Sequence, residues 1–228
     1  LTQETAALIS KAGVKVTITP ADGEQAAFDI AGTVYRPFPT GGFDIARRLR
    51  DMDAAGVDVH VLSATPQTYL YDQEAALAVA TSTLQNDQIA KLVKAHPDRF
   101  MGIATLPMQA PDRAAAELTR AARQLGMHGA MIGSNIAGRN LDDPSLEPVW
   151  AAAAQLGAFM IIHPTNVAGA DRLRSYYLNN LIGNPLDTTI AAASLVFGGV
   201  IERFPNIRFY MVHGGGFTPY QAGRWQHG

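Results

Sequence analysis

From residue 43 onward, short apolar runs alternate with longer segments whose apolar residues recur at helical spacing. The runs have the apolar, β-rich character of buried parallel strands. We predict strands at residues 57–62, 100–106, 128–133, 158–163 and 207–212. We predict helices at residues 43–55, 72–95, 111–125, 143–157 and 185–203. This regular alternation is typical of an α/β fold with a mostly parallel sheet and covering helices.

The first 42 residues follow a different pattern. Residues 14–19 alternate between apolar and polar side chains, residues 20–23 carry turn-forming types, and residues 28–35 return as a second strand. We therefore expect a β-hairpin over residues 14–35, inserted over one end of the fold.

Two architectures fit the alternation: an open doubly wound sheet and a (β/α)8 barrel of the TIM type. The sequence has no glycine-rich first turn of the kind that binds a ligand in open sheets. Polar residues instead follow several strands, as they do at the mouth of a barrel. They are Ser63, Thr65, Ser134, Asn135, His163 and His213. We predict the barrel. Because only five core strands are found, we expect residues 1–228 to cover about strands 2–6 of a single barrel domain that is incomplete at both ends.

Composition narrows the classes of function. The chain has 228 residues, a formal net charge of -2 and no cysteine. The lack of cysteine excludes disulfides, thiolate zinc sites and a cysteine nucleophile within this sequence. Near-neutral charge without a basic run argues against nucleic acid and anionic membranes as partners. No apolar run approaches the ~18 residues of a membrane span. We expect a cytoplasmic enzyme.

Two predicted strands end in histidine. His163 is followed by Pro164, and His213 is followed by three glycines. Because carboxyl ends of neighbouring barrel strands share one mouth, we expect the two side chains to face the same site. Histidine is the commonest metal ligand and the usual acid–base group near neutral pH. The pair indicates a metal with a bound water. The alternative is two hydrogen-bonded histidines in a polar mouth. For the other histidines, His60, His96, His128 and His227, we expect no catalytic role.

Two arginines are candidates for carboxylate binding. Arg36 stands between a tyrosine and a proline, and Arg224 follows Gly223, eleven residues after His213. A guanidinium suits bidentate capture of a carboxylate. Taken alone, each arginine is expected to be a solvated surface residue.

Short motifs along the chain are also informative through their order and spacing. They are Met52–Asp58, Leu62-Ser63, Asn86-Asp87, Pro97–Phe100, Leu106-Pro107, Leu141–Pro144, His163-Pro164, Asn180–Gly183, Asp187–Thr189, Phe197–Val200, Glu202–Pro205, His213–Gly216 and Gly223-Arg224. Together they resemble the amidohydrolase-related decarboxylases, of the aminocarboxymuconate semialdehyde decarboxylase type. The resemblance runs from Arg36 nearly to the last residue.

The resemblance implies a barrel that binds one divalent metal, usually zinc, with manganese as the alternative. His163 matches a metal ligand, and His213 matches the histidine that works on the metal-bound water. Arg36 matches an arginine that grips a substrate carboxylate. Arg224 matches one that reaches into the neighbouring subunit's site, which implies a homodimer. The family's His-x-His pair on strand one and aspartate on strand eight have no counterparts here. We expect these remaining ligands outside residues 1–228.

Three functions remain open at this stage. The first is a metal-dependent, non-oxidative decarboxylase of an unsaturated or aromatic carboxylic acid, in which the histidine at the second strand end activates a metal-bound water. The second is a metal-dependent hydrolase or hydratase on the same scaffold, since fold resemblance does not separate these reactions. The third is a non-catalytic relative that kept the scaffold and lacks the metal.

Overall fold

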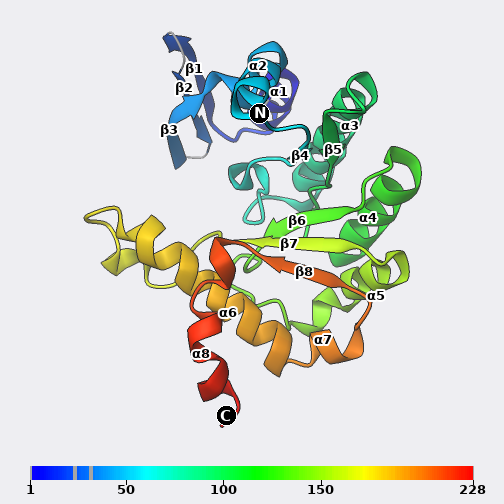
Figure 1. Cartoon of the computed structure of the whole chain (residues 1–228), viewed down its shortest axis with the longest axis vertical. Helices are drawn as coiled ribbons and strands as arrows, with labels where there is room; N and C mark the ends of the chain where they lie inside the picture. Colours follow the sequence, from blue (N-terminus) through cyan, green and yellow to red (C-terminus); the bar gives the residue numbers. More distant parts are fainter. Residues whose placement is uncertain (1, 23–24, 31–32, 228) are drawn as a thin grey trace.

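The computed structural model describes residues 2–22, 25–30 and 33–227 (Figure 1). Its helices are α1 (Gln3–Lys11), α2 (Ile45–Ala55), α3 (Ala75–Ala95), α4 (Pro111–Leu125), α5 (Glu147–Leu156), α6 (Asn184–Phe197), α7 (Val200–Arg203) and α8 (Thr218–Trp225). Its strands are β1 (Val16–Asp22), β2 (Gln25–Ile30), β3 (Thr33–Pro39), β4 (His60–Leu62), β5 (Phe100–Gly102), β6 (Gly129–Gly133), β7 (Phe159–His163) and β8 (Arg208–Met211). Strand and helix alternate from α2 to β8, which confirms the α/β class.

The five strands β4 to β8 lie side by side in the order of the sequence. β4 pairs with β5, and β6 pairs with β7 and β7 with β8, all in parallel. Ala104, just after β5, makes a parallel bridge with Ala130 of β6 and so joins the two ladders. A doubly wound sheet reverses its strand order at a switch point. The described strands keep one direction of progression, which is the order of a TIM-type barrel.

The two faces of this parallel sheet differ. Side chains alternate between the faces of a strand, and the face that carries Phe100, Met160 and Ile162 is buried under the helices. The opposite face is exposed on β4, β5 and β8, where Val61, Met101 and Tyr210 are 55%, 43% and 54% exposed, and is buried on β6. Figure 1 shows α3, α4 and α5 together along one side of the strands. In a barrel the helices cover the outer face of the sheet, and the inner face packs on the other strands.

Most predicted helices are confirmed within a few residues, and α4 has the predicted bounds. The predicted helix at 185–203 is wrong as a single element. It is divided into α6 and α7 at Gly198-Gly199, where Gly199 has a φ of 69°. A left-handed residue ends a helix, so the chain turns here before β8. Two helices, α1 and α8, were not predicted from the pattern.

The predicted hairpin over residues 14–35 is corrected to a three-stranded antiparallel sheet. β1 pairs with β2, and β2 pairs with β3, which continues to Pro39. The run predicted as one strand over 28–35 is two strands, since Ile30 pairs with Thr33.

The N-terminal sheet packs on the remainder of the chain through a small core of its own. Ile9 of α1, Phe28 and Ile30 of β2, and Leu70 in the connection between β4 and α3 are buried together. The sheet therefore lies over the segment that follows the carboxyl end of β4. Of the described helices, none combines the length and apolar character that a bilayer span requires.

Candidate active site

The carboxyl ends of β7 and β8 bring His163 and His213 together. His163 is the last residue of β7, and His213 begins the turn that follows β8. Their ring centroids are 5.7 Å apart, with the planes at 66°. The predicted pairing of the two strand-end histidines is therefore present in the structure.

His163 has one ring nitrogen engaged and one available. Its Nδ1 lies 2.9 Å from the carbonyl oxygen of Pro164. A carbonyl only accepts, so Nδ1 carries the proton and Nε2 keeps its lone pair. Burial lowers the pKa of His163 below the usual histidine value; the Pro164 carbonyl opposes this shift, and His213 adds to it. The ring is thus held as a neutral imidazole with Nε2 free to bind a metal.

His213 occupies a backbone conformation that is rare for a residue with a side chain. Its φ is 54°, in the left-handed region, and Gly214, Gly215 and Gly216 also have positive φ. Such strain costs about 1–3 kcal/mol and persists only where the surroundings impose it. Its Nδ1 lies 3.5 Å from the hydroxyl oxygen of Thr188. Burial lowers the pKa of His213, which favours the neutral ring that a general base needs.

A buried carboxylate, that of Asp187, lies beside these strand ends. It is 5% exposed and accepts hydrogen bonds from the hydroxyl of Ser134, from the Asn135 amide at 3.1 Å and from the Ala168 N–H at 3.2 Å. Ser134 and Asn135 directly follow β6, as predicted for a polar mouth. The carboxyl ends of β6, β7 and β8 therefore share one polar edge. The two histidines of this edge were predicted from the sequence. The position of Asp187 was not, although the Asp187–Thr189 motif was singled out from the sequence.

Of the two candidate arginines, the structure describes the side chain of Arg224 alone. Arg36 lies in β3, and its side chain is outside the described part. Arg224 is exposed on α8, which runs along α6 away from the β8 end (Figure 1). Its neighbour Trp225 packs on Phe197, with ring centroids 5.4 Å apart. Phe197 is nine residues beyond Thr188, about 13 Å along the helix axis.

The remaining histidines lie away from this edge. His128 is exposed before β6, and His96 ends α3 with its ring edge-on to Phe100 at 5.7 Å. His60 opens β4, and His227 is exposed after α8. Tyr69 and Tyr71 are stacked in the core, with their ring centroids 5.2 Å apart.

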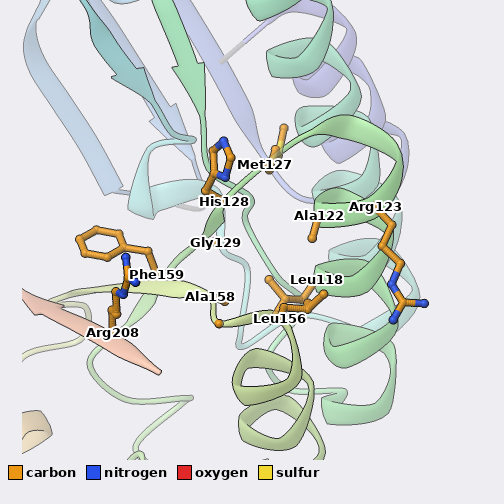
Figure 2. Close-up of a pocket in the computed structure, with 11 residues that line it drawn as sticks. Leu118, Ala122, Arg123, Met127, His128, Gly129, Leu156, Ala158, Phe159 and Arg208 are labelled. Atoms are coloured by element: carbon orange, nitrogen blue, oxygen red, sulfur yellow. The ribbon is translucent and has the colours of Figure 1, made fainter. Parts of the chain in front are cut away.

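A cavity of about 440 Å³ lies at the opposite, amino end of the strands (Figure 2). Its lining includes Arg123, His128 and Arg208. The side chains of Arg123 and Arg208 lie on opposite sides of it and do not converge in the view of Figure 2. The amino end of a barrel is the end that serves stability, so the candidate site stays at the histidine pair.

The described residues supply part of a metal site. Among residues 2–22, 25–30 and 33–227, no three His, Cys, Asp or Glu side chains are grouped so as to hold a metal ion. His163 fits as one ligand, because its Nε2 lone pair is free and its Nδ1–H is held by a carbonyl, as metal-binding histidines require. A complete set of metal ligands is therefore not found among the described residues.

Comparison with known proteins identifies the family. The amidohydrolase family matches residues 14–227, which is nearly the whole chain. The chain belongs to the amidohydrolase family. A curated relative, 2-amino-3-carboxymuconate-6-semialdehyde decarboxylase of Dictyostelium discoideum, is 39% identical over 204 residues. That match covers 90% of this chain and 57% of the relative. The resemblance drawn from the short motifs is thereby confirmed.

Solved structures of this amidohydrolase group match the same region. The 5-carboxyvanillate decarboxylase of Sphingomonas paucimobilis aligns with a TM-score of 0.74 at 30% identity, covering 81% of this chain and 56% of that one. The 5-carboxyvanillate decarboxylase of Novosphingobium aromaticivorans aligns with a TM-score of 0.75 at 29% identity, covering 79% and 52%. The latter was solved with manganese and 4-hydroxy-3-methoxy-5-nitrobenzoic acid. The chain thus spans a little over half the length of the relatives that it matches.

Proposed function

We propose that this protein is a metal-dependent, non-oxidative decarboxylase of a small unsaturated or aromatic carboxylic acid. The observation that carries the proposal is the pair of histidines in contact at adjacent strand ends. It occurs in a chain that is 39% identical to a decarboxylase over 90% of its length. The Novosphingobium relative, a decarboxylase with bound manganese and an aromatic acid, supports the metal and the substrate class.

His163 would hold the metal through Nε2, together with a His-x-His pair and an aspartate that we propose lie outside residues 1–228. Zinc and manganese both accept imidazole and carboxylate ligands. A divalent metal at this edge would lower the pKa of a bound water and polarise substrate oxygens. The held Nδ1–H of His163 fixes the ring orientation that such a bond needs.

His213 would be the proton carrier of the reaction. Burial lowers its pKa, which favours the neutral ring, so it can take a proton as a base and return it as an acid. In the overall reaction a carbon–carbon bond breaks and carbon dioxide leaves. The electron pair of that bond remains on the substrate carbon, which takes the proton. No oxidant or reductant is needed.

Arg36 and Arg224 would orient the substrate carboxylate, Arg36 from its own subunit and Arg224 from a neighbour. The position of α8 supports the second role. Arg224 is exposed on α8, whose Trp225 packs at the far end of α6 from Thr188. An arginine so placed suits a partner's site better than its own, and we propose a homodimer.

We also propose that the single domain of each subunit closes as a (β/α)8 barrel. Strands β4–β8 would be about strands 2–6 of this barrel, with their more exposed face inward.

The test measures carbon dioxide and product from aromatic and unsaturated mono- and dicarboxylic acids, using the full-length protein with added zinc or manganese. The proposal predicts carbon dioxide release without oxygen consumption, and loss of that release in His213→Asn. His96→Asn is the matched control and retains activity. If the protein hydrolyses esters, lactones or amides and releases carbon dioxide from no acid, the decarboxylase assignment is wrong and the hydrolase assignment takes its place.

A further inference from the structure

We infer that the first turns of α6 form a positioning device for the two histidines, in which Asp187, Thr188 and Thr189 each hold a different part of the site. Thr188 has the most specific role, because it keeps the proton of His213 on Nδ1 and leaves Nε2 as the proton acceptor. This inference rests on the proposed function for its catalytic meaning, and its structural content is independent of it.

Thr189 holds the turn that follows His213. Its hydroxyl donates to the Pro185 carbonyl at 2.8 Å and accepts from the N–H of Phe217 at 2.6 Å. Gly216 lies against the same turn of α6, where a Cβ atom would stand 2.1 Å from the Pro185 oxygen. The turn after His213 therefore packs directly on α6. These contacts hold the backbone of His213 in its left-handed conformation.

The hydroxyl oxygen of Thr188 faces the ring of His213, and its proton is used in another hydrogen bond. The hydroxyl donates to the Asn184 carbonyl at 2.9 Å. The remaining lone pairs can only accept, and His213 Nδ1 is the ring nitrogen 3.5 Å away. That distance is at the long limit of a hydrogen bond, as is common for catalytic groups before substrate binds. The arrangement favours an Nδ1–H tautomer, matching that of His163.

Asp187 holds the segment around His163. Its carboxylate accepts from the Ser134 hydroxyl, whose oxygen in turn accepts from the N–H of Thr165 at 3.1 Å. The N–H of Ser134 donates to the carbonyl of His163 at 2.8 Å. The end of β7 is thus fixed on both sides of Pro164. Three consecutive residues of one helix therefore set the relative positions of two strand ends.

The first test determines the tautomer of His213 by 15N NMR of the imidazole nitrogens in the full-length, metal-free protein. Above the pKa of the ring we expect Nδ1 protonated and Nε2 bare. Thr188→Val keeps the side-chain shape and removes the hydroxyl, so the Nε2–H form should appear. Thr188→Ser keeps the hydroxyl and should restore the original spectrum. An Nε2–H tautomer in the unmodified protein, or an unchanged spectrum in Thr188→Val, would overturn the inference.

Kinetics give the second readout. Thr188→Val should lower kcat by roughly tenfold or more, because a histidine in the wrong tautomer is a poor base, and should leave KM unchanged. Thr188→Ser should retain kcat. A rise in KM alone, with kcat intact, would reject the positioning role. If the protein proves not to be a decarboxylase, the NMR result still decides the inference, so the two failures are distinguishable.

A third variant separates Asp187 from Thr188. Asp187→Asn cannot accept all three hydrogen bonds, so we expect the affinity of the full-length protein for manganese to fall by roughly tenfold. Asp171→Asn, at an exposed position in the connection between β7 and α6, is the control and should leave this affinity unchanged. Equal manganese affinity in the Asp187→Asn variant and the unmodified protein would show that Asp187 does not position the metal-binding histidine.

Discussion

His163 and His213 stand at the ends of adjacent parallel strands with their ring centroids 5.7 Å apart. The Nδ1 atom of each lies beside an oxygen, the Pro164 carbonyl at 2.9 Å and the Thr188 hydroxyl at 3.5 Å. Both rings thereby direct Nε2 away from their supports. This shared arrangement is the structural basis for assigning one ring to a metal and the other to a proton.

The turn after His213 should tolerate an added methyl group at one glycine and reject it at another. Gly214→Ala meets no atom within 4 Å and carries only the strain of a φ of 62°, about 1 kcal/mol. Gly216→Ala also has a φ of 62° and would place Cβ 2.1 Å from the Pro185 oxygen. We expect Gly216→Ala to lose about 2 kcal/mol more of unfolding free energy, and most activity. Equal losses in urea unfolding would contradict the close packing of this turn on α6.

Asn86 joins a helix to the carboxyl end of β5. It is fully buried, accepts from the Thr105 N–H at 2.8 Å, and donates to the Thr105 carbonyl at 3.0 Å and to Glu117 at 2.7 Å. Asn86→Ala leaves the N–H and carbonyl of Thr105 unpaired, whereas Glu117 keeps its ion pair with Arg120. The change should cost about 3 kcal/mol of unfolding free energy. The exposed Gln124→Ala should change it by less than about 0.5 kcal/mol. Similar values for both variants would show that water replaces the Asn86 amide.

Stability should decline at alkaline pH because of two buried phenols. Burial raises the pKa of Tyr69 and of Tyr71 well above the usual tyrosine value. Below about pH 10 the phenols are neutral in both folded and unfolded chains, and their contribution is complete. As the pH rises further, the unfolded chain releases protons that the folded chain retains, so the free energy of unfolding falls.

Urea unfolding from about pH 8 to about pH 11 measures this loss. The double variant Tyr69→Phe, Tyr71→Phe should flatten the alkaline decline, whereas Tyr220→Phe, at a tyrosine that is 89% exposed, should not. The idea fails if all three proteins lose stability in parallel.

Mixing inactive variants tests whether Arg224 serves a neighbouring subunit. A heterodimer of His213→Asn and Arg224→Ala chains contains one intact site, so random mixing should restore about a quarter of the original activity. Mixing His213→Asn with His163→Ala is the control and should restore none, since both changes fall in sites of their own subunits. Without recovery in the first mixture, Arg224 does not act across an interface.

The regular part of the fold could be predicted because its periodicity is local. The apolar runs around Ile161 and Tyr210 and the helix ending before Gly126 needed no distant information. The three-stranded sheet was missed because residues 28–35 read as one strand, whereas the structure divides them between β2 and β3. The two histidines could be placed because carboxyl ends of adjacent parallel strands meet. The hydrogen bonds of Asp187 and Thr188 could not be predicted, since they join residues 25 to 53 positions apart and the Asp187–Thr189 motif does not indicate their partners.

Elemental analysis of purified full-length protein, beside the His163→Ala variant, tests directly whether His163 binds a divalent metal. His128→Ala, at an exposed histidine on the opposite end of the strands, is the matched control. We expect about one zinc or manganese per subunit in the unmodified protein and in the control, and loss of that metal in His163→Ala. A full equivalent retained by His163→Ala, or none in the unmodified protein after exposure to both metals, would contradict it.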